Sequence, residues 1–511
     1  MKKYILIASS LLCLAFTNSC SESDLELESQ SLDNIEKPLT EEKIQMLLSG
    51  AYFNLSSTSA YGTEAMIAGD LLGDNLFVST QNPSYLFTAN KTYSATQGDI
   101  GFYGLMYNVI VACNTVINST VASNANVDRI KAEAKIVRGF AYFTLVNYYS
   151  PSPASGVNQE YGVPIVLGNY DSLIQPARST VAQVYEQIIS DLTAGVSGAT
   201  VAPTSKSILG KAAAELLLSR VYLTRRAPGD AELALQYASD IVNNQGNRNN
   251  GIITPGPYSL IPIEQAEYYN YFASTNDAIS EGNFETIWEL DQNDNANIVT
   301  GIGSNVSLPG YYSRLDSRRC LLFTQNFYNT FTTGTGTTST DVRRGSTATG
   351  ATSLLISTGA PTTDTPRGYW TNKYPRLTSA NATSNQQPYF RNIKVLRFAE
   401  AELNRVEALY HTGQQALALT ELNNFATKRR GKLYSSTGTA LLTDILTERA
   451  KEFYGEGQRF WDLKRYNLPI VKATNCVSNC NVPAGDKLFV LPVGQGSINA
   501  NPNLKQYPGY N

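Results

Sequence analysis

Residues 448–467 read ERAKEFYGEGQRFWDLKRYN, and nowhere else in the chain do so many charged and large aromatic residues lie together. The apolar spacing predicts a helix over 444–454 that stops near Gly455. Gly455 and Gly457 permit a bend, and the aromatic residues around Trp461 then return to the interior with charged residues between them. Charges among core aromatics must be paired, so we predict a structural network of Arg–carboxylate ion pairs here. A catalytic pair of carboxylates is the alternative interpretation.

Segment 448–467 resembles the C-terminal signature of the SusD/RagB family of Bacteroidetes outer-membrane lipoproteins, the SusD-like proteins. The resemblance spans almost the whole mature chain, and it implies a mostly α fold: a tetratricopeptide-like helical scaffold with an inserted irregular, loop-rich ligand-binding subdomain. Other segments are similar to further parts of the family and follow its order: RIKAEAKIVRGFAYFTLVNYYS with YGVPIVL (129–167), GKAAAELLLSRVYLTRR (210–226), RNIKVLRFAEAELNRVEALYHTGQQALALTELNNFATKRRG (391–431) and LFVLPVGQGSINANPNLKQYPGY (488–510).

The N-terminus has the order of an export signal. Lys2 and Lys3 precede an apolar run, 4–16, which is shorter than the about 20 residues that cross a bilayer. Cys20 stands where a bacterial lipoprotein signal would be cleaved and the new N-terminal cysteine acylated, so we predict lipidation at Cys20; an ordinary secretory signal with an incidental cysteine is the alternative. The acidic run 22–28 is a solvated tether. Acidic residues directly after the cysteine also resemble the signal that directs lipoproteins of this family to the outer face of the membrane. We therefore expect a lipid-anchored protein on the outer membrane, facing the exterior.

Composition excludes one class of ligand and favours another. The net charge is −3 and the basic residues form no stripe, so we exclude nucleic acid as a partner. Charged residues are 16% of the chain, whereas tyrosines number 31, so the surface binds through neutral polar groups. Tyrosine offers a rigid apolar face and a hydroxyl group, which suits sugar rings and also suits peptides.

Histidine and cysteine usage restricts the chemistry further. The single histidine, His411, is expected at the surface near a helix end, so a His-rich zinc site is excluded and a Ser-His-Asp triad would have to use His411. We predict no metal-ligating residues and no cofactor, and the sequence leaves open whether a calcium ion is bound. Cys113 and Cys320 are expected to be buried or isolated thiols. Cys476 and Cys480 lie in one loop, and the sequence leaves open whether they form a disulfide.

We divide the chain into a signal peptide (1–19), an acidic tether (20–38), an N-terminal helical region (39–245), a loop-rich ligand-facing insertion (246–390) and a C-terminal helical region (391–511). The insertion alternates short apolar runs with Gly, Asn, Ser and Thr and carries aromatic pairs throughout; surface decoration of the scaffold is the alternative for it. Helical spacing predicts helices over 41–53, 104–118, 127–148, 180–192, 209–225 and 231–243.

Aromatic residues in polar loops are the candidate ligand-binding residues. Trp288 alternates like a strand residue and is expected in the core, and Trp461 is expected to be structural. For Trp370, the sequence favours neither a core position nor a ligand-binding position. The family's ligand-stacking aromatics come from comparable loops without a fixed motif. The candidates are Tyr85, Phe87 and Tyr93 between two predicted helices, and Tyr268, Tyr269, Tyr311, Tyr312 and Trp370 in the insertion.

The resemblance implies a non-catalytic receptor that captures oligosaccharides and delivers them to a SusC-like TonB-dependent transporter in the outer membrane. Peptide capture by a RagB-like receptor is the alternative within the same architecture. A surface glycoside hydrolase is the rival from another class, because many Asp and Glu residues are available for a carboxylate pair. The acidic residues cluster in predicted helices and in 448–467 rather than in the aromatic loops, which favours binding without catalysis.

Overall fold

The computed structural model describes residues 39–244, 258–260, 265–274, 276–292, 306–332, 339–345, 352–357, 366–376, 389 and 391–510. Cys20, the predicted signal peptide and the predicted tether lie outside these residues. Within them, no helix is long and apolar enough to cross a membrane.

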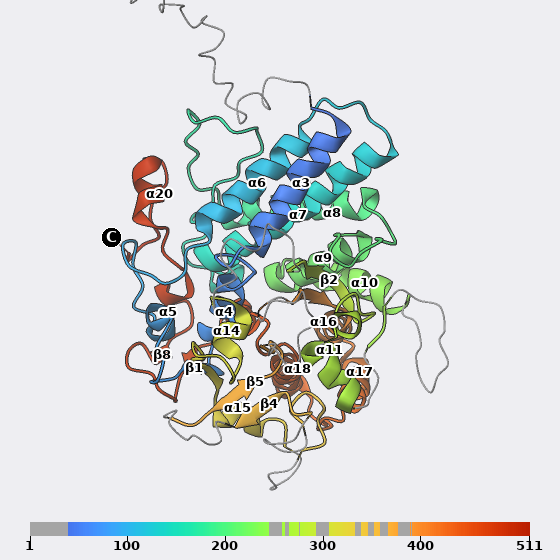
Figure 1. Cartoon of the computed structure of the whole chain (residues 1–511), viewed down its shortest axis with the longest axis vertical. Coiled ribbons are helices and arrows are strands. Elements are labelled where there is room, and N and C mark those ends of the chain that lie inside the picture. Colours follow the sequence, from blue (N-terminus) through green and yellow to red (C-terminus); the bar gives the residue numbers. More distant parts are fainter. Residues whose placement is uncertain are drawn as a thin grey trace, which may run out of the picture.

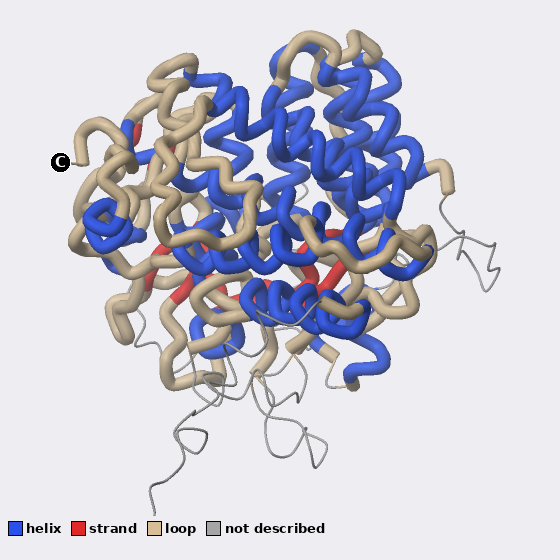
Figure 2. Tube along the Cα trace, turned by 90° about the horizontal axis from the view of Figure 1, so that it is seen from above, coloured by secondary structure: helices blue, strands red, loops and turns tan. Residues whose placement is uncertain are grey.

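Long helices from the two ends of the chain form one scaffold (Figure 1). Consecutive helices pack against each other in the order α3, α6, α7, α8, α9, α10, α16, α17, α18, so the N-terminal and C-terminal regions are joined between α10 and α16. Figure 2 shows these helices gathered in one part of the molecule, with loops crowded around the C-terminus. The mostly α scaffold that the sequence predicted is confirmed. The helices are α3 Glu41–Ser56, α6 Tyr103–Ile117, α7 Ala125–Tyr149, α8 Val181–Gly198, α9 Lys211–Arg225, α10 Asp230–Val242, α16 Phe398–His411, α17 Gln415–Lys428, α18 Gly438–Glu452 and α19 Arg459–Arg465.

Capping residues explain where the N-terminal helices begin. The Thr40 side chain accepts a hydrogen bond from the backbone of Lys43 at the start of α3. Thr180 and Gln183 form a reciprocal capping box at the start of α8. Such caps satisfy backbone N–H groups that have no partner inside the helix. All six helices predicted in the first half of the chain are confirmed, with ends shifted by a few residues.

Short elements fill the space between the long helices. The insertion was predicted as irregular and loop-rich, with strand-like alternation around Trp288; it contributes that strand and three others to two small antiparallel sheets. One sheet has the order β1-β3-β5-β4, with β1 Leu76–Val78, β3 Leu321–Phe323, β5 Tyr369–Thr371 and β4 Leu355–Ser357; the others pair β2 Thr286–Leu290 with β6 Ile393–Arg397, and β7 Ile470–Val471 with β8 Asn481–Val482. The short helices are α4 Glu64–Leu71, α5 Leu86–Asn90, α11 Gln265–Ala273, α12 Asp277–Ser280, α14 Leu308–Tyr312, α15 Gln325–Asn329 and α20 Gln495–Ala500, with the 3-10 turns η2 Pro153–Ser155 and η3 Lys487–Phe489.

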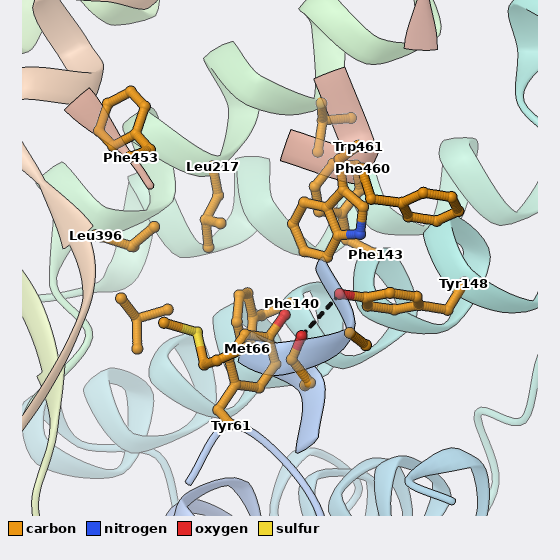
Figure 3. Packing of buried hydrophobic residues seen from close by; sticks show 14 of the residues in the cluster. Tyr61, Met66, Phe140, Phe143, Tyr148, Leu217, Leu396, Phe453, Phe460 and Trp461 are labelled. Carbon is orange, nitrogen blue, oxygen red and sulfur yellow. Dashed lines mark hydrogen bonds between the residues drawn. The ribbon is translucent and has the colours of Figure 1, made fainter. Parts of the chain in front are cut away.

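One large apolar core draws side chains from the N-terminal region, the insertion and the C-terminal region. Aromatic residues of α7 and α19 meet at its centre (Figure 3): the ring centroids of Tyr148 and Trp461 are 5.5 Å apart, and those of Phe143 and Trp461 are 5.8 Å apart. The Tyr148 hydroxyl donates to the Ala65 carbonyl at 2.8 Å, so its polar end is satisfied inside the core. The core roles predicted for Trp288 and Trp461 are confirmed, since both are buried.

The segment 448–467 adopts the predicted helix, bend and return. Helix α18 ends at Glu452, and Gly455 and Gly457 take the left-handed φ values of 76° and 74° before α19 begins. The bend lies directly on α4, because the Gly457 N–H donates to the Asp70 carboxylate at 2.8 Å. A Cβ atom added to Gly69 would collide with the Gly457 carbonyl, so this contact requires glycine.

The predicted ion-pair network is also confirmed. We call its largest part the buried ion cluster, and its members in the described chain are five cations and five carboxylates, all buried. It connects the insertion, which supplies four of the ten residues, to β6, α17 and the segment that begins at α18. The members are Arg343, Lys373, Arg397, Arg429 and Lys451 with Glu285, Asp341, Glu448, Glu452 and Glu456.

Candidate binding site

Two loops that are distant in sequence meet at the surface near β1 and form what we call the loop site. The first follows β1 and runs to 101, and the second runs from 313 to 320 after α14. The Ser79 N–H donates to the Cys320 carbonyl at 2.7 Å, and the Asn82 amide donates to the Arg319 carbonyl at 3.4 Å. The two loops are therefore fixed against each other by one backbone hydrogen bond and one hydrogen bond from the Asn82 side chain.

Helix α5 presents the aromatic side chains of the first loop. Tyr85 precedes it with a left-handed φ of 58°, which is uncommon for a bulky residue and requires support from its surroundings. The Asp99 carboxylate supplies part of that support by accepting from the Phe87 and Thr88 N–H groups at 2.9 and 3.2 Å. The Tyr85 ring rests edge-on against Tyr311, with centroids 5.0 Å apart. Phe87 consequently lies at the surface with 38% of its area exposed.

A disulfide hairpin holds the other end of α5. Cys476 and Cys480 form a disulfide in the loop between β7 and β8, which answers the question that the sequence left open. Between them, the Asn479 amide donates to the carbonyls of Asn90 and Lys91 at 3.1 and 3.0 Å. Last-turn carbonyls have no partner within a helix, so Asn479 satisfies the C-terminal end of α5. Helix α5 is thus fixed at both ends.

The second loop adds charged and polar groups beside the aromatic residues. The Asp316 carboxylate accepts from the Tyr389 hydroxyl at 2.8 Å and pairs with Arg376 at 3.0 Å. Arg318 is exposed, and its guanidinium lies 3.5 Å from the Tyr311 hydroxyl. Burial raises the pKa of Tyr389, so its hydroxyl remains a hydrogen-bond donor at neutral pH. The site therefore combines apolar rings with neutral and charged hydrogen-bonding groups.

Five of the eight aromatic candidates are buried and cannot stack on a ligand in this structure, so we correct their assignment. Tyr93 donates to the Leu488 carbonyl at 2.6 Å, and Tyr268 donates to Glu452 in the buried ion cluster at 3.1 Å. Tyr312 stacks on Phe323, while Trp370 packs in a small apolar cluster with Phe77 and Leu322. Tyr311 acts as the support beneath Tyr85. The buried candidates are Tyr93, Tyr268, Tyr311, Tyr312 and Trp370.

The three remaining candidates retain accessible area. Tyr85 and Phe87 belong to the loop site, whereas Tyr269 packs against a separate apolar cluster around Tyr271 and Phe272. Sequence reasoning missed Tyr389, whose aromatic ring stands in a Gln- and Pro-containing stretch like those that contain the other candidates. It also missed Asp316 and Arg318, for which only their position just after the Tyr311–Tyr312 pair gave a signal.

The other residues singled out by the sequence have structural surroundings. His411 ends α16 as expected, but it is half-buried and its Nε2 lies 2.7 Å from the Tyr466 hydroxyl. Burial lowers the pKa of His411. Cys113 and Cys320 are free, buried thiols. Among the described residues, no group of three or more His, Cys, Asp or Glu side chains is arranged to hold a metal ion.

Comparison with known proteins identifies the family. A family model described as "Starch-binding associating with outer membrane" matches residues 23–223, and the model of the SusD family matches residues 355–510. A SusD-like protein of Bacteroides ovatus is 31% identical over 163 residues, which are 29% of this chain and 28% of that relative. The starch-binding protein SusD of Bacteroides thetaiotaomicron is 28% identical over 125 residues, or 23% of this chain and 22% of the relative. The chain thus aligns with less than a third of the length of these curated relatives.

Solved structures extend the likeness to nearly the whole chain. The crystal structure of a SusD superfamily protein from Bacteroides thetaiotaomicron matches with a TM-score of 0.74 at 26% identity, covering 92% of this chain and 100% of that one. The two family models match one region near each end of the chain, and these regions contain nearly all of the segments that resemble the family. The chain belongs to the SusD/RagB family.

Proposed function

We propose that this protein is a non-catalytic cell-surface lipoprotein that captures oligosaccharides at the loop site and delivers them to a SusC-like TonB-dependent transporter. The observation that carries the proposal is α5, which is fixed at both ends and holds Phe87 at the surface beside Tyr85. The description of the N-terminal family model and the name of the starch-binding relative support a glycan as the ligand.

The loop site has the two kinds of group that a sugar ring requires. A pyranose presents apolar C–H faces, which the rings of Tyr85 and Phe87 can cover, and hydroxyl groups around its edge. The exposed Arg318 guanidinium offers donors for those hydroxyls, and the Tyr389 hydroxyl, held by the buried Asp316, offers an acceptor. A few stacked rings and exposed hydrogen bonds must offset the loss of ligand freedom, so we expect micromolar to millimolar affinity, roughly −4 to −8 kcal/mol. Weak capture suits release to a transporter.

Calorimetry with a panel of oligosaccharides and peptides tests the ligand class. Phe87→Ala should weaken oligosaccharide binding about tenfold, equivalent to about 1.4 kcal/mol. The matched control is Tyr170→Ala, because Tyr170 is an exposed aromatic residue outside the loop site. Equal binding by both variants and the unchanged protein would reject the loop site. Binding of peptides without any oligosaccharide would favour the RagB-like alternative.

Chromatography of the incubated ligand tests the absence of catalysis. Bound oligosaccharides should be recovered intact after prolonged incubation, since the carboxylates of 448–467 are engaged by buried cations rather than placed at the loop site. Shorter products that disappear with a carboxylate variant would establish a hydrolase instead.

The anchor is proposed at Cys20, and the described chain begins at Leu39 just before α3. Cys20→Ala should abolish acylation and release the protein from outer-membrane fractions of cells that lack the transporter. Complete retention in those fractions would contradict the lipid anchor.

Delivery is tested by isolating the lipidated protein together with its transporter. We expect a stable complex and an uptake defect when the lipoprotein is deleted. Normal oligosaccharide uptake by the deletion strain would contradict the delivery step even if binding in solution were intact.

A further inference from the structure

A cavity lies between α3, the start of α7, the loop 200–208 and the end of β2, and it shares no lining residue with the loop site. Its volume is about 650 Å³, which falls within the range of about 300–1,000 Å³ for small-molecule sites. We propose that this cavity is a second carbohydrate site, which binds a neutral oligosaccharide segment. The ligand class rests on the proposed function, whereas the location rests on the cavity alone. In Figure 1, α3 and α7 run beside each other, away from α5 and α14.

The apolar part of the cavity contains an exposed aromatic ring on a rigid element. Phe53 lies in the last turns of α3 and has 40% of its area exposed. Its neighbour Tyr52 also lines the cavity and is fixed by the core, since its ring centroid lies 6.3 Å from that of buried Trp288. Ala202, Pro203, Ile208 and Leu290 add apolar side chains to the lining. An exposed ring on a fixed helix loses little freedom when a sugar face stacks on it.

The polar part of the cavity is a wall of side chains that are hydrogen-bonded to one another. The buried Glu133 carboxylate accepts from the Tyr52 hydroxyl at 2.6 Å and from Arg129 at 3.0 Å. The Tyr52 hydroxyl in turn accepts from the Leu209 N–H at 3.1 Å, and Arg129 donates to the Gln45 side-chain carbonyl at 3.2 Å. Because every member has a partner, the wall keeps its shape without a ligand, and its one cation and one carboxylate offset each other.

The remaining lining groups suit hydroxyls better than an ion. Ser49 and Thr204 contribute hydroxyl groups near the opening, and both residues are exposed. Asp291 adds a carboxylate, which accepts hydrogen bonds from sugar hydroxyls. A neutral polyhydroxylated ring satisfies such a mixed set, whereas an anion would face Asp291. Two sites on one molecule would retain a long glycan by avidity while each single contact stayed weak.

Native mass spectrometry over a titration with maltoheptaose, or with the strongest binder of the calorimetric panel, counts the occupied sites at each concentration. At concentrations near the dissociation constants of the unchanged protein, that protein should show species with up to two oligosaccharides, and Phe53→Ala and Phe87→Ala should each show mainly one. We expect Phe53→Ala to weaken one of the two affinities at least tenfold. Met46→Ala is the matched control, because Met46 is an exposed apolar residue on α3 that does not line the cavity. It should leave both sites occupied.

The two proposals fail in different ways in this experiment. A single bound oligosaccharide that Phe87→Ala removes and Phe53→Ala leaves in place would overturn the second site and support the loop site. A single one that only Phe53→Ala removes would support the cavity and overturn the loop site. If the unchanged protein binds no oligosaccharide on the panel, both proposals are overturned.

Discussion

Replacing Glu452 with alanine tests whether the charged segment 448–467 is structural. Glu452 is completely buried, and its carboxylate accepts from Arg397 at 2.9 Å, from Arg429 at 3.1 Å and from Tyr268 at 3.1 Å. Burial alone would raise the pKa of Glu452, but the guanidiniums of Arg429, Arg397 and Arg343 hold it well below its usual range. The carboxylate is therefore ionised in the folded protein at neutral pH.

The expected cost follows from the charge balance of the buried ion cluster. Its described members are five cations and five carboxylates, so Glu452→Ala leaves a net positive charge with no access to water. Breaking a buried ion pair by removing one partner typically costs 3–5 kcal/mol, and we expect a loss of about that size in the free energy of unfolding. Arg397 and Arg429 keep Glu285, at 2.7 and 2.8 Å, which limits the loss.

Equilibrium urea unfolding measures the effect, with two further variants for comparison. Glu452→Gln keeps the side-chain volume and an acceptor for Tyr268, so it isolates the loss of charge and should retain most of the cost. Glu421→Ala is the control, because the Arg405–Glu421 pair at 2.8 Å has both side chains more than a fifth exposed. Such a pair contributes at most about 1 kcal/mol. A Glu452→Ala loss no larger than that of Glu421→Ala, or weaker oligosaccharide binding with unchanged stability, would refute a structural role for this segment.

Three further predictions concern other parts of the structure. Gly69→Ala should lower the melting temperature strongly because its Cβ would collide with the Gly457 carbonyl, whereas Gly50→Ala, with nothing within 4 Å of its Cβ, should be neutral or stabilising by up to about 1 kcal/mol. The buried Glu407 and Glu448 carboxyls have pKa values lowered to about 2 from 4.5, because neighbouring cations outweigh their burial. Each should contribute about 3 kcal/mol above pH 4.5 that is lost as the pH falls towards 2, so Glu407→Gln should flatten the decline in urea midpoint between pH 5 and pH 3. Replacing both Cys476 and Cys480 with alanine should weaken oligosaccharide binding at the loop site while changing the melting temperature little, because the hairpin between these residues holds α5. Unchanged binding would show that α5 is positioned without the disulfide.

Local sequence patterns predicted the parts of the fold that depend on local signals. Helix α8 has an apolar stripe and a Thr180–Gln183 capping box, and both features depend only on residues that are close together in the sequence. The bend at Gly455 and Gly457 was predictable because only glycine adopts such backbone angles without strain. The strand around Trp288 was predicted from its alternation, but the pairing of β1 with β3 was not, because these strands lie more than 240 residues apart and each has only three residues. Strands this short carry too little alternation to be recognised alone.

The sequence located candidate aromatic residues in loops, but it did not distinguish the exposed residues from the buried ones. Phe87 and Tyr93 lie six residues apart in the same polar stretch, yet Phe87 is exposed and Tyr93 is buried. The difference comes from distant contacts: Asp99 fixes α5 so that Phe87 faces outward, while the Leu488 carbonyl near the C-terminus accepts from the Tyr93 hydroxyl. Tyr312 shows the same effect, because its burial depends on Phe323 in β3. No local pattern distinguishes an aromatic ring that packs from one that is displayed.

The buried ion cluster explains how a loop-rich insertion keeps a definite position on the helical scaffold. Part of the insertion packs into the main apolar core, as Trp288 and Phe323 do. Arg343 and Lys373 of the insertion also reach Glu448 and Glu456 of the C-terminal segment, both at 2.6 Å. Buried ion pairs add little net stability, but each tolerates few alternative geometries, because a displaced charge would remain unpaired. The dense charges of 448–467 therefore specify where the insertion sits, and Tyr454 of the same segment packs on Phe323 of β3, with ring centroids 5.1 Å apart.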